Sequence, residues 1–346
     1  MIFLKIIKCV AVVIVALLLL GALYQYIATK LDARKYPPIG KLIDIGGYKL
    51  HMIDSQFQAS KNYDAIMPTV ILDSGIGSTT FDWLLVYPEI AKFARVIAYD
   101  RAGYGWSDAS PLQRTSANIV AELHTMLHNA GVQGPYILVG HSFGGMNVRL
   151  FAATYPDEVV GIVLVDAVHE SVMDKLPQIF IEFKKWISHR FIASYCGIPR
   201  IISDYKSYVY PVEKKNKAVD RLHKTTIEYY RTLYNQLNLM PTSCEQMKAA
   251  RASLPDVPVI VITEGKRVIS EQGPCGSYTS DEVAKINATW LELQADLLTL
   301  FPQSKQMIAE HSGHNIPYEQ PQIIAVAVEA LWRSRVDAVR EMIIKL

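Results

Sequence analysis

Apart from its N-terminus, the chain shows a repeating pattern in which short apolar runs alternate with longer amphipathic segments. The short runs are rich in Val and Ile and contain few polar residues, which is typical of strands buried on both faces of a parallel sheet. They comprise residues 68–73, 95–100, 135–140, 161–166 and 258–263, with a weaker run at 305–309. Ahead of them, residues 41–54 alternate apolar and polar positions around Gly46-Gly47, which predicts a hairpin.

The segments between these runs have helical periodicity. In residues 115–129 the apolar side chains fall on one helical face, and residues 144–155 and 321–332 also suit helices. Alternating strands and helices predict an α/β fold with a doubly wound, mostly parallel sheet. The alternation stops between Val168 and Leu254, where helix-length patterns continue without a clear strand. We therefore predict a helical cap inserted into the sheet domain.

The N-terminus carries a different pattern. Residues 9–28 contain Gln25 as their only strongly polar residue, and about 20 such residues cross a hydrocarbon layer of ~30 Å. A cleaved signal peptide would need a small-x-small site after the apolar run, and residues 21–24 offer no convincing one. We expect a single-pass transmembrane helix that contacts the lipid bilayer through residues 9–28. Basic residues flank both ends, but Lys5 and Lys8 ahead of the span favour an extracytoplasmic globular domain.

Together these patterns predict six consecutive segments. They are a transmembrane anchor (1–28), a linker (29–39), the first part of the sheet domain (40–167), the helical cap (168–255), the second part of the sheet domain (256–335) and a C-terminal tail (336–346). The net charge is only +2, from 35 basic and 33 acidic residues, which gives no electrostatic reason to expect nucleic acid as a partner.

The cysteines add little to this picture. Cys9 lies in the apolar span, and Cys196, Cys244 and Cys275 lack the spacing of metal ligands. In an exported domain one pair of these three could be bridged, whereas buried free thiols explain them equally well. No metal site is predicted.

The candidate chemistry centres on Gly140-His141-Ser142-Phe143-Gly144. A G-x-S-x-G pattern alone is weak, but here it follows the apolar run 135–140 and precedes a helix-like segment, which is the context of a nucleophilic serine. The glycines leave room for the strained turn that presents such a serine. Ser142 is the predicted nucleophile, and the backbone N–H of Phe143 is the first predicted oxyanion donor.

A serine nucleophile needs a base and a second oxyanion donor. His314 follows the last predicted strand, which returns it to the carboxyl edge of the sheet, where Ser142 also lies. His311 is the competing histidine, but it lies closer to the strand and is better suited to a structural role. The loop of small residues at 74–78 lets the backbone approach a substrate carbonyl, so the N–H of Ile76 is the second predicted donor.

With these motifs the sequence resembles the α/β-hydrolase family, specifically its esterase-like branch with a cap. The resemblance extends from about Gly40 to Trp332. It implies a Ser–acid–His triad in that chain order and no metal or organic cofactor. Haloalkane dehalogenases and epoxide hydrolases look similar but place Asp at the nucleophile, so Ser142 argues against both activities. The landmarks of the resemblance are residues 74–75, 100–107, 140–145, 165–167 and 312–314.

The acid is where the sequence departs from the family pattern. Many members carry G-x-x-D after the strand at 258–264, whereas this chain has Gly265-Lys266-Arg267-Val268. Asp166 ends the preceding strand, a position that holds the acid in some relatives, and is the preferred candidate. Glu264, at the end of the 258–264 strand, is the alternative, and a carboxylate between residues 266 and 282 is a third.

The predicted activity is hydrolysis of a carboxylic ester, with a small-molecule ester or acyl compound as substrate and an acyl-enzyme as intermediate. An amidase or aminopeptidase, an acyltransferase and a cofactor-free perhydrolase would use the same residues and stay open. Outside enzymes, the alternative is a ligand-binding protein that kept the fold without turnover, which the missing G-x-x-D acid supports. No nucleotide cofactor is expected, because the Gly75-x-Gly77 and Gly103-x-Gly105 pairs lack a third glycine.

Overall fold

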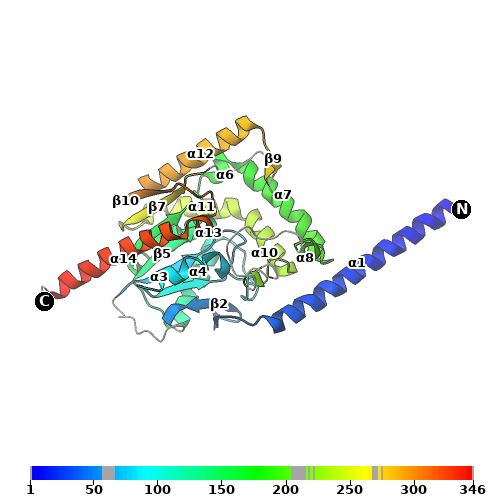
Figure 1. Cartoon of the computed structure of the whole chain (residues 1–346), viewed down its shortest axis with the longest axis horizontal. Helices are drawn as coiled ribbons and strands as arrows, with labels where there is room; N and C mark the ends of the chain where they lie inside the picture. Colours follow the sequence, from blue (N-terminus) through cyan, green and yellow to red (C-terminus); the bar gives the residue numbers. More distant parts are fainter. Residues whose placement is uncertain are drawn as a thin grey trace.

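An eight-stranded sheet forms the centre of the molecule (Figure 1). The computed structural model describes residues 2–56, 67–203, 216, 219–220, 223–266, 272–273 and 276–344. The strand order is β1-β2-β4-β3-β5-β6-β7-β10, antiparallel between β1, β2 and β4 and parallel across the rest. This confirms the predicted α/β class. The strands are β1 (Lys41–Asp44), β2 (Lys49–Asp54), β3 (Thr69–Asp73), β4 (Val96–Tyr99), β5 (Tyr136–His141), β6 (Val159–Val165), β7 (Val259–Glu264) and β10 (Ser304–Ala309).

Helices cover both faces of this sheet, which explains why the central strands lack polar alternation. Along β5, Tyr136 and Leu138 pack into one apolar cluster, whereas Ile137 and Val139 pack into another on the opposite face. The weaker pattern of β10 also has a physical reason, because β10 is an edge strand and most of its side chains are at least partly exposed. The first cluster contains residues of α4 (Ser116–Asn129), α5 (Phe143–Thr154), α11 (Met240–Ala250) and α12 (Ser280–Thr299), and the second contains residues of α3 (Tyr87–Ile90) and α14 (Pro321–Ile344).

Between β6 and β7 the described residues form helices and no strand, as the sequence pattern predicts. α7 and α10 pack against each other, with the rings of Phe191 and Tyr234 stacked at 5.9 Å between centroids. α11 packs instead on α4 and α5, so it belongs to the helical layer over the sheet. The α-helices described in this insertion are α6 (Val172–Lys175), α7 (Pro177–Ser194), α8 (Ile198–Ser203), α10 (Ile227–Asn238) and α11.

The N-terminal helix α1 (Ile2–Lys35) projects from the body of the molecule (Figure 1). Its length and apolar composition are sufficient to cross a membrane. The helix continues to Lys35, into the segment 29–39 that the sequence pattern assigned to a linker. It ends just before Pro37-Pro38, because proline lacks the N–H that an α-helix requires and disfavours helical backbone in the residue before it.

Candidate active site

Ser142 occupies a sharp turn between β5 and α5. Its φ of 53° and ψ of −119° are strained for a residue with a side chain. Steric constraints require glycine at both flanking positions. A Cβ at Gly144 would lie 2.2 Å from the Asp73 carbonyl oxygen, and one at Gly140 would lie 2.5 Å from the Gly144 carbonyl oxygen. The turn therefore presents the Ser142 hydroxyl beyond the end of β5, at the N-terminus of α5.

His314 bridges Ser142 and Asp166. Its Nε2 lies 3.0 Å from Ser142 Oγ, and its Nδ1 lies 2.6 Å from Asp166 Oδ2. His314 comes from the loop between β10 and α13 (Ile316–Glu319), so three segments of the chain converge at the carboxyl edge of the sheet. His311, the competing histidine, is exposed in the same loop.

Asp166 is fully buried at the end of β6, with φ at 42°. Besides His314, it accepts hydrogen bonds from the backbone N–H of Glu264 at 3.3 Å and from the indole N–H of Trp290, which lies 3.1 and 3.2 Å from its two oxygens. The Trp290 ring, on α12, also meets the His314 ring edge-on at 5.7 Å. Nothing in the sequence pattern pointed to Trp290, because it lies on an ordinary amphipathic helix remote in sequence.

Glu264, the alternative acid, is buried beside Asp166, and it is Asp166 that His314 contacts. Burial, together with the negative charges of Asp166 and Glu319, raises the pKa of Glu264 to about 9. Its Oε2 has no hydrogen-bond partner among the described residues. Glu264 is therefore protonated at neutral pH and carries no charge with which to stabilise an imidazolium. Of the third group of candidates, Asp281 is exposed on the first turn of α12, and residues 267–271 lie outside the described part of the chain.

The loop after β3 approaches Ser142 closely. A Cβ at Gly75 would lie 3.4 Å from the Cβ of Ser142, so the backbone at this position is next to the Ser142 side chain. The buried Arg101 holds the loop from behind: its guanidinium donates to Asp73 Oδ1 at 2.5 Å, to the Ser74 carbonyl at 2.6 Å and to the Gly75 carbonyl. With these carbonyls turned to Arg101, the N–H of Ile76 is left without a protein acceptor among the described residues.

His141, next to Ser142, was not singled out from the sequence. Burial and the neighbouring His314 lower the pKa of His141 to about 4, so it is neutral. Its Nε2 lies 2.8 Å from the backbone carbonyl of His314, which identifies Nε2 as the protonated nitrogen and donor. This bond ties the loop that carries His314 to the loop that carries Ser142.

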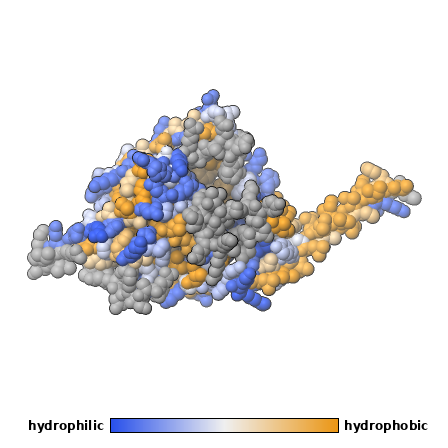
Figure 2. Space-filling model, in the orientation of Figure 1, coloured by the Kyte–Doolittle hydropathy of each residue, from blue (hydrophilic) through white to orange (hydrophobic). Residues whose placement is uncertain are grey.

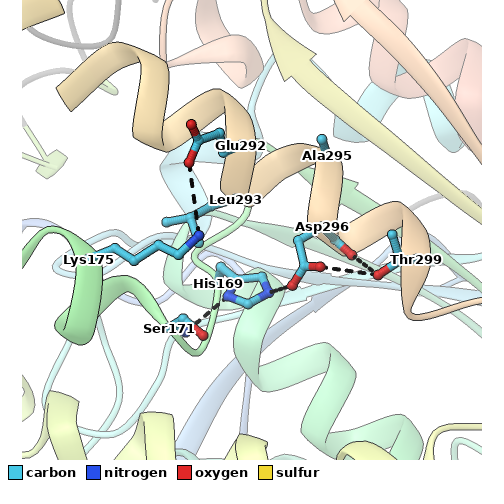
Figure 3. A pocket seen from close by; sticks show the side chains of 8 residues that line it. All are labelled: His169, Ser171, Lys175, Glu292, Leu293, Ala295, Asp296 and Thr299. Carbon is cyan, nitrogen blue, oxygen red and sulfur yellow. Dashed lines mark hydrogen bonds and ion pairs between the residues drawn. The ribbon is translucent and has the colours of Figure 1, made fainter. Parts of the chain in front are cut away.

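A second His–Asp pair joins the segment after β6 to α12, in a surface pocket of about 370 Å³ (Figure 3). His169 Nε2 is 2.9 Å from Asp296 Oδ2, and the backbone N–H of Ser171 donates to His169 Nδ1 at 3.0 Å. Because Ser171 contributes its backbone and not its hydroxyl, this cluster does not reproduce the Ser142 arrangement. It connects α12 to the segment after β6, as does the Gln294 side-chain amide, which donates to the Ala167 carbonyl at 2.7 Å.

The described residues contain no group of three or more His, Cys, Asp or Glu side chains placed to hold a metal ion. Cys9, Cys196 and Cys244 are free thiols, and burial raises the pKa of Cys244 to about 11. Cys275, the fourth cysteine, lies outside the described residues.

Residues 68–321 match the family model of the α/β hydrolase fold, and the chain belongs to that family. Hydrolysis is the class of reaction that this membership supports. The chain is similar to the uncharacterized protein YqjL of Bacillus subtilis (strain 168), at 24% identity over 76% of this chain and 83% of that protein.

Solved structures show the same fold. Lip1 of Acinetobacter baumannii AYE, described as a candidate lipase, superposes with a TM-score of 0.62 at 16% identity, covering 91% of this chain and 97% of that chain. The epoxide hydrolase CorEH superposes with a TM-score of 0.59 at 16% identity, covering 85% and 98% respectively. Neighbours of different activities share this fold, so the reaction has to be argued from the site itself.

Proposed function

We propose that this protein is a serine hydrolase in which Ser142, His314 and Asp166 form the catalytic triad. The observation that carries the proposal is the continuous chain of contacts from Ser142 Oγ through His314 to Asp166, at 3.0 and 2.6 Å. In this arrangement His314 accepts the hydroxyl proton as Ser142 attacks a carbonyl carbon. Asp166 accepts the Nδ1–H bond, which leaves Nε2 free to act as base, and stabilises the imidazolium that forms.

The substrate class that fits this site best is a carboxylic ester. As Ser142 attacks, the carbonyl oxygen becomes an oxyanion, which the N–H groups of Phe143 and Ile76 would stabilise. Collapse expels the alcohol, with His314 returning the proton, and leaves an acyl-Ser142 that water hydrolyses by the same steps. A serine at the elbow, in place of aspartate, speaks against the epoxide chemistry of neighbours such as CorEH.

We further propose that α1 anchors this activity in a lipid bilayer. The apolar side chains of its N-terminal part are exposed along the whole segment, which the space-filling view shows as a continuous apolar rod (Figure 2). Exposed apolar surface of this extent on a single helix is stable in hydrocarbon and costly in water. The extracytoplasmic position of the globular domain stays a prediction from Lys5 and Lys8.

Labelling with a fluorophosphonate probe tests the proposed nucleophile. The full-length protein should be labelled, Ser142→Ala should lose both labelling and turnover of p-nitrophenyl esters, and Ser171→Ala should keep both. Ser171 is the matched control because it also lies beside a His–Asp pair but contributes only its backbone N–H. Unlabelled wild-type protein would favour the ligand-binding alternative, and labelling that survives Ser142→Ala would place the nucleophile elsewhere.

A further inference from the structure

The cap carries an exposed apolar surface close to α1. Five large side chains form it, at the end of α7, in the following turn and on α8. We call this group the cap patch: Ile192, Tyr195, Ile198, Ile201 and Ile202. Their spacing of three or four positions within each helical stretch places them on shared faces. Single exposed apolar residues are ordinary, but a contiguous group marks an interaction surface.

The cap is fastened to α1 by buried polar contacts. Gln25 of α1 is almost fully buried; its side-chain amide donates to the Thr225 carbonyl at 3.0 Å, and its oxygen accepts from Arg200 Nε at 3.2 Å. Arg200 of α8 also donates to the hydroxyl of Thr29 at 3.3 Å and forms an ion pair with Asp32. One arginine of the cap thus contacts three successive turns of α1.

Close backbone packing extends this contact toward the N-terminus. A Cβ at Gly21 of α1 would lie 2.5 Å from the carbonyl oxygen of Cys196, and one at Gly197 would lie 3.0 Å from the Tyr24 ring. The turn between α7 and α8 therefore packs directly against α1 at residues 21–24. Small residues at both positions allow this approach.

These contacts lie at the level of the apolar span. Gly21, Tyr24 and Gln25 all belong to residues 9–28, and at a rise of 1.5 Å per residue Gly21 lies about 10 Å before the end of the span. If α1 crosses a bilayer with this span, the α7–α8 turn is level with the outer part of the hydrocarbon layer. The neighbouring cap patch then meets lipid, and the apolar surface continues from α1 onto the body (Figure 2).

We propose that the cap patch is seated in the interface of the bilayer that α1 crosses, so that the hydrolase domain rests on the membrane through its cap. This inference rests on the proposed anchoring role of α1. The cap patch contacts lipid at the boundary between headgroups and acyl chains, where amphipathic helices bury their apolar faces about 5–10 Å deep. Gln25, Arg200 and Asp32, the polar groups that join the cap to α1, do not oppose insertion, because they hydrogen-bond to one another and to neighbouring residues.

Depth-dependent quenching in liposomes tests this seating with the full-length protein. A small fluorescent amino acid is placed singly at Leu17 in the middle of the span, at Ile201 in the cap patch and at Val326 on α14. Ile201 and Val326 are matched, since both are exposed aliphatic residues on helices, at 57% and 56%. The liposomes contain phosphatidylcholine brominated either near the glycerol end or deep in the acyl chains, and thermal unfolding checks that each labelled protein is folded.

We expect Leu17 to lose fluorescence mainly with deep bromines, Ile201 mainly with shallow bromines, and Val326 with neither. Quenching of Leu17 without quenching of Ile201 would leave the anchor in place and overturn the seating of the cap. An unquenched Leu17 would overturn the anchor itself, and with it this inference. If Ile201 escapes bromine but its emission shifts to the blue as protein density rises, a second copy of the chain covers the patch instead.

Discussion

The buried carboxyl of Glu264 permits a quantitative test of the electrostatics around Asp166. In the folded protein Glu264 stays protonated up to a pKa of about 9, because burial and the Asp166 and Glu319 charges oppose ionisation. Glu264→Gln keeps the size and neutrality of the side chain and removes the ionisable proton. The variant should be more stable than the wild type at neutral pH and should keep the proposed esterase activity.

The magnitude follows from proton linkage. Above its ordinary pKa of 4.5, Glu264 in the unfolded chain loses its proton, whereas the folded protein keeps it. Folding must then take up a proton, so stability falls by about 1.36 kcal/mol for each pH unit between the two pKa values. At pH 7 this cost amounts to about 3 kcal/mol, and at pH 5 it is below about 1 kcal/mol. The Glu264→Gln variant would not carry this cost at either pH.

Thermal unfolding of the full-length protein in detergent micelles measures the difference. At pH 7 the variant should unfold about 6–12 °C above the wild type, since about 2–4 °C accompany each kcal/mol in domains of about 150–250 residues. At pH 5 the two curves should nearly coincide. Esterase activity measured in parallel should be similar for both proteins, because the backbone N–H of residue 264 still donates to Asp166.

Two results would refute this reasoning. A difference in melting temperature that does not change between pH 5 and pH 7 would show that Glu264 is ionised in the folded protein. Loss of orders of magnitude in kcat on Glu264→Gln, with Asp166→Asn retaining activity, would transfer the role of triad acid to Glu264.

Three further substitutions probe the same site. Asp166→Asn should lower kcat by about 10⁴-fold with little change in KM, because an amide cannot hold His314 in the tautomer that acts as base. Steady-state kinetics measure both constants, and a near-wild-type kcat would contradict the assignment of Asp166. Trp290→Phe keeps an aromatic ring but removes the indole N–H that donates to the Asp166 carboxylate. We expect kcat to fall by roughly 10- to 100-fold and the acidic limb of the kcat/KM profile to move to higher pH. An unchanged profile would leave Trp290 a packing role only. Gly144→Ala should prevent folding, because its Cβ would overlap the Asp73 carbonyl. The measurement is the amount of soluble protein after detergent extraction, and a folded variant would contradict the requirement for glycine at this position.

Much of the fold could be predicted from local patterns. The central strands β3, β5 and β6 are buried on both faces, so almost every position had to be apolar, and this leaves a signal in any short window. Ser142 and His314 could be predicted as site residues for a related reason. Each lies in a local motif next to a strand end, and parallel strands bring their carboxyl ends to one edge of the sheet.

Which carboxylate contacts His314 could be learned only from the tertiary structure. Asp166 and Glu264 both end parallel strands that are neighbours in the sheet, and nothing in their local sequence distinguishes which carboxylate reaches His314. The packing decides it: Trp290 of α12 donates to Asp166, whereas Glu264 is buried without a partner for its Oε2 among the described residues and keeps its proton.

The N-terminal segment shows the same division between sequence and structure. Its apolar run predicts a membrane span from composition alone, because a bilayer requires apolar side chains on every face of the helix. The sequence pattern did not indicate that α1 continues past the span or that Gln25 is buried against the cap. Within the apolar run, Gln25 looks like an isolated polar interruption. Local sequence thus determined which segments form strands, helices and the apolar span. Contacts between residues far apart along the chain decided which carboxylate meets His314, which side chain donates to that carboxylate and how α1 docks, because these depend on how the elements pack together.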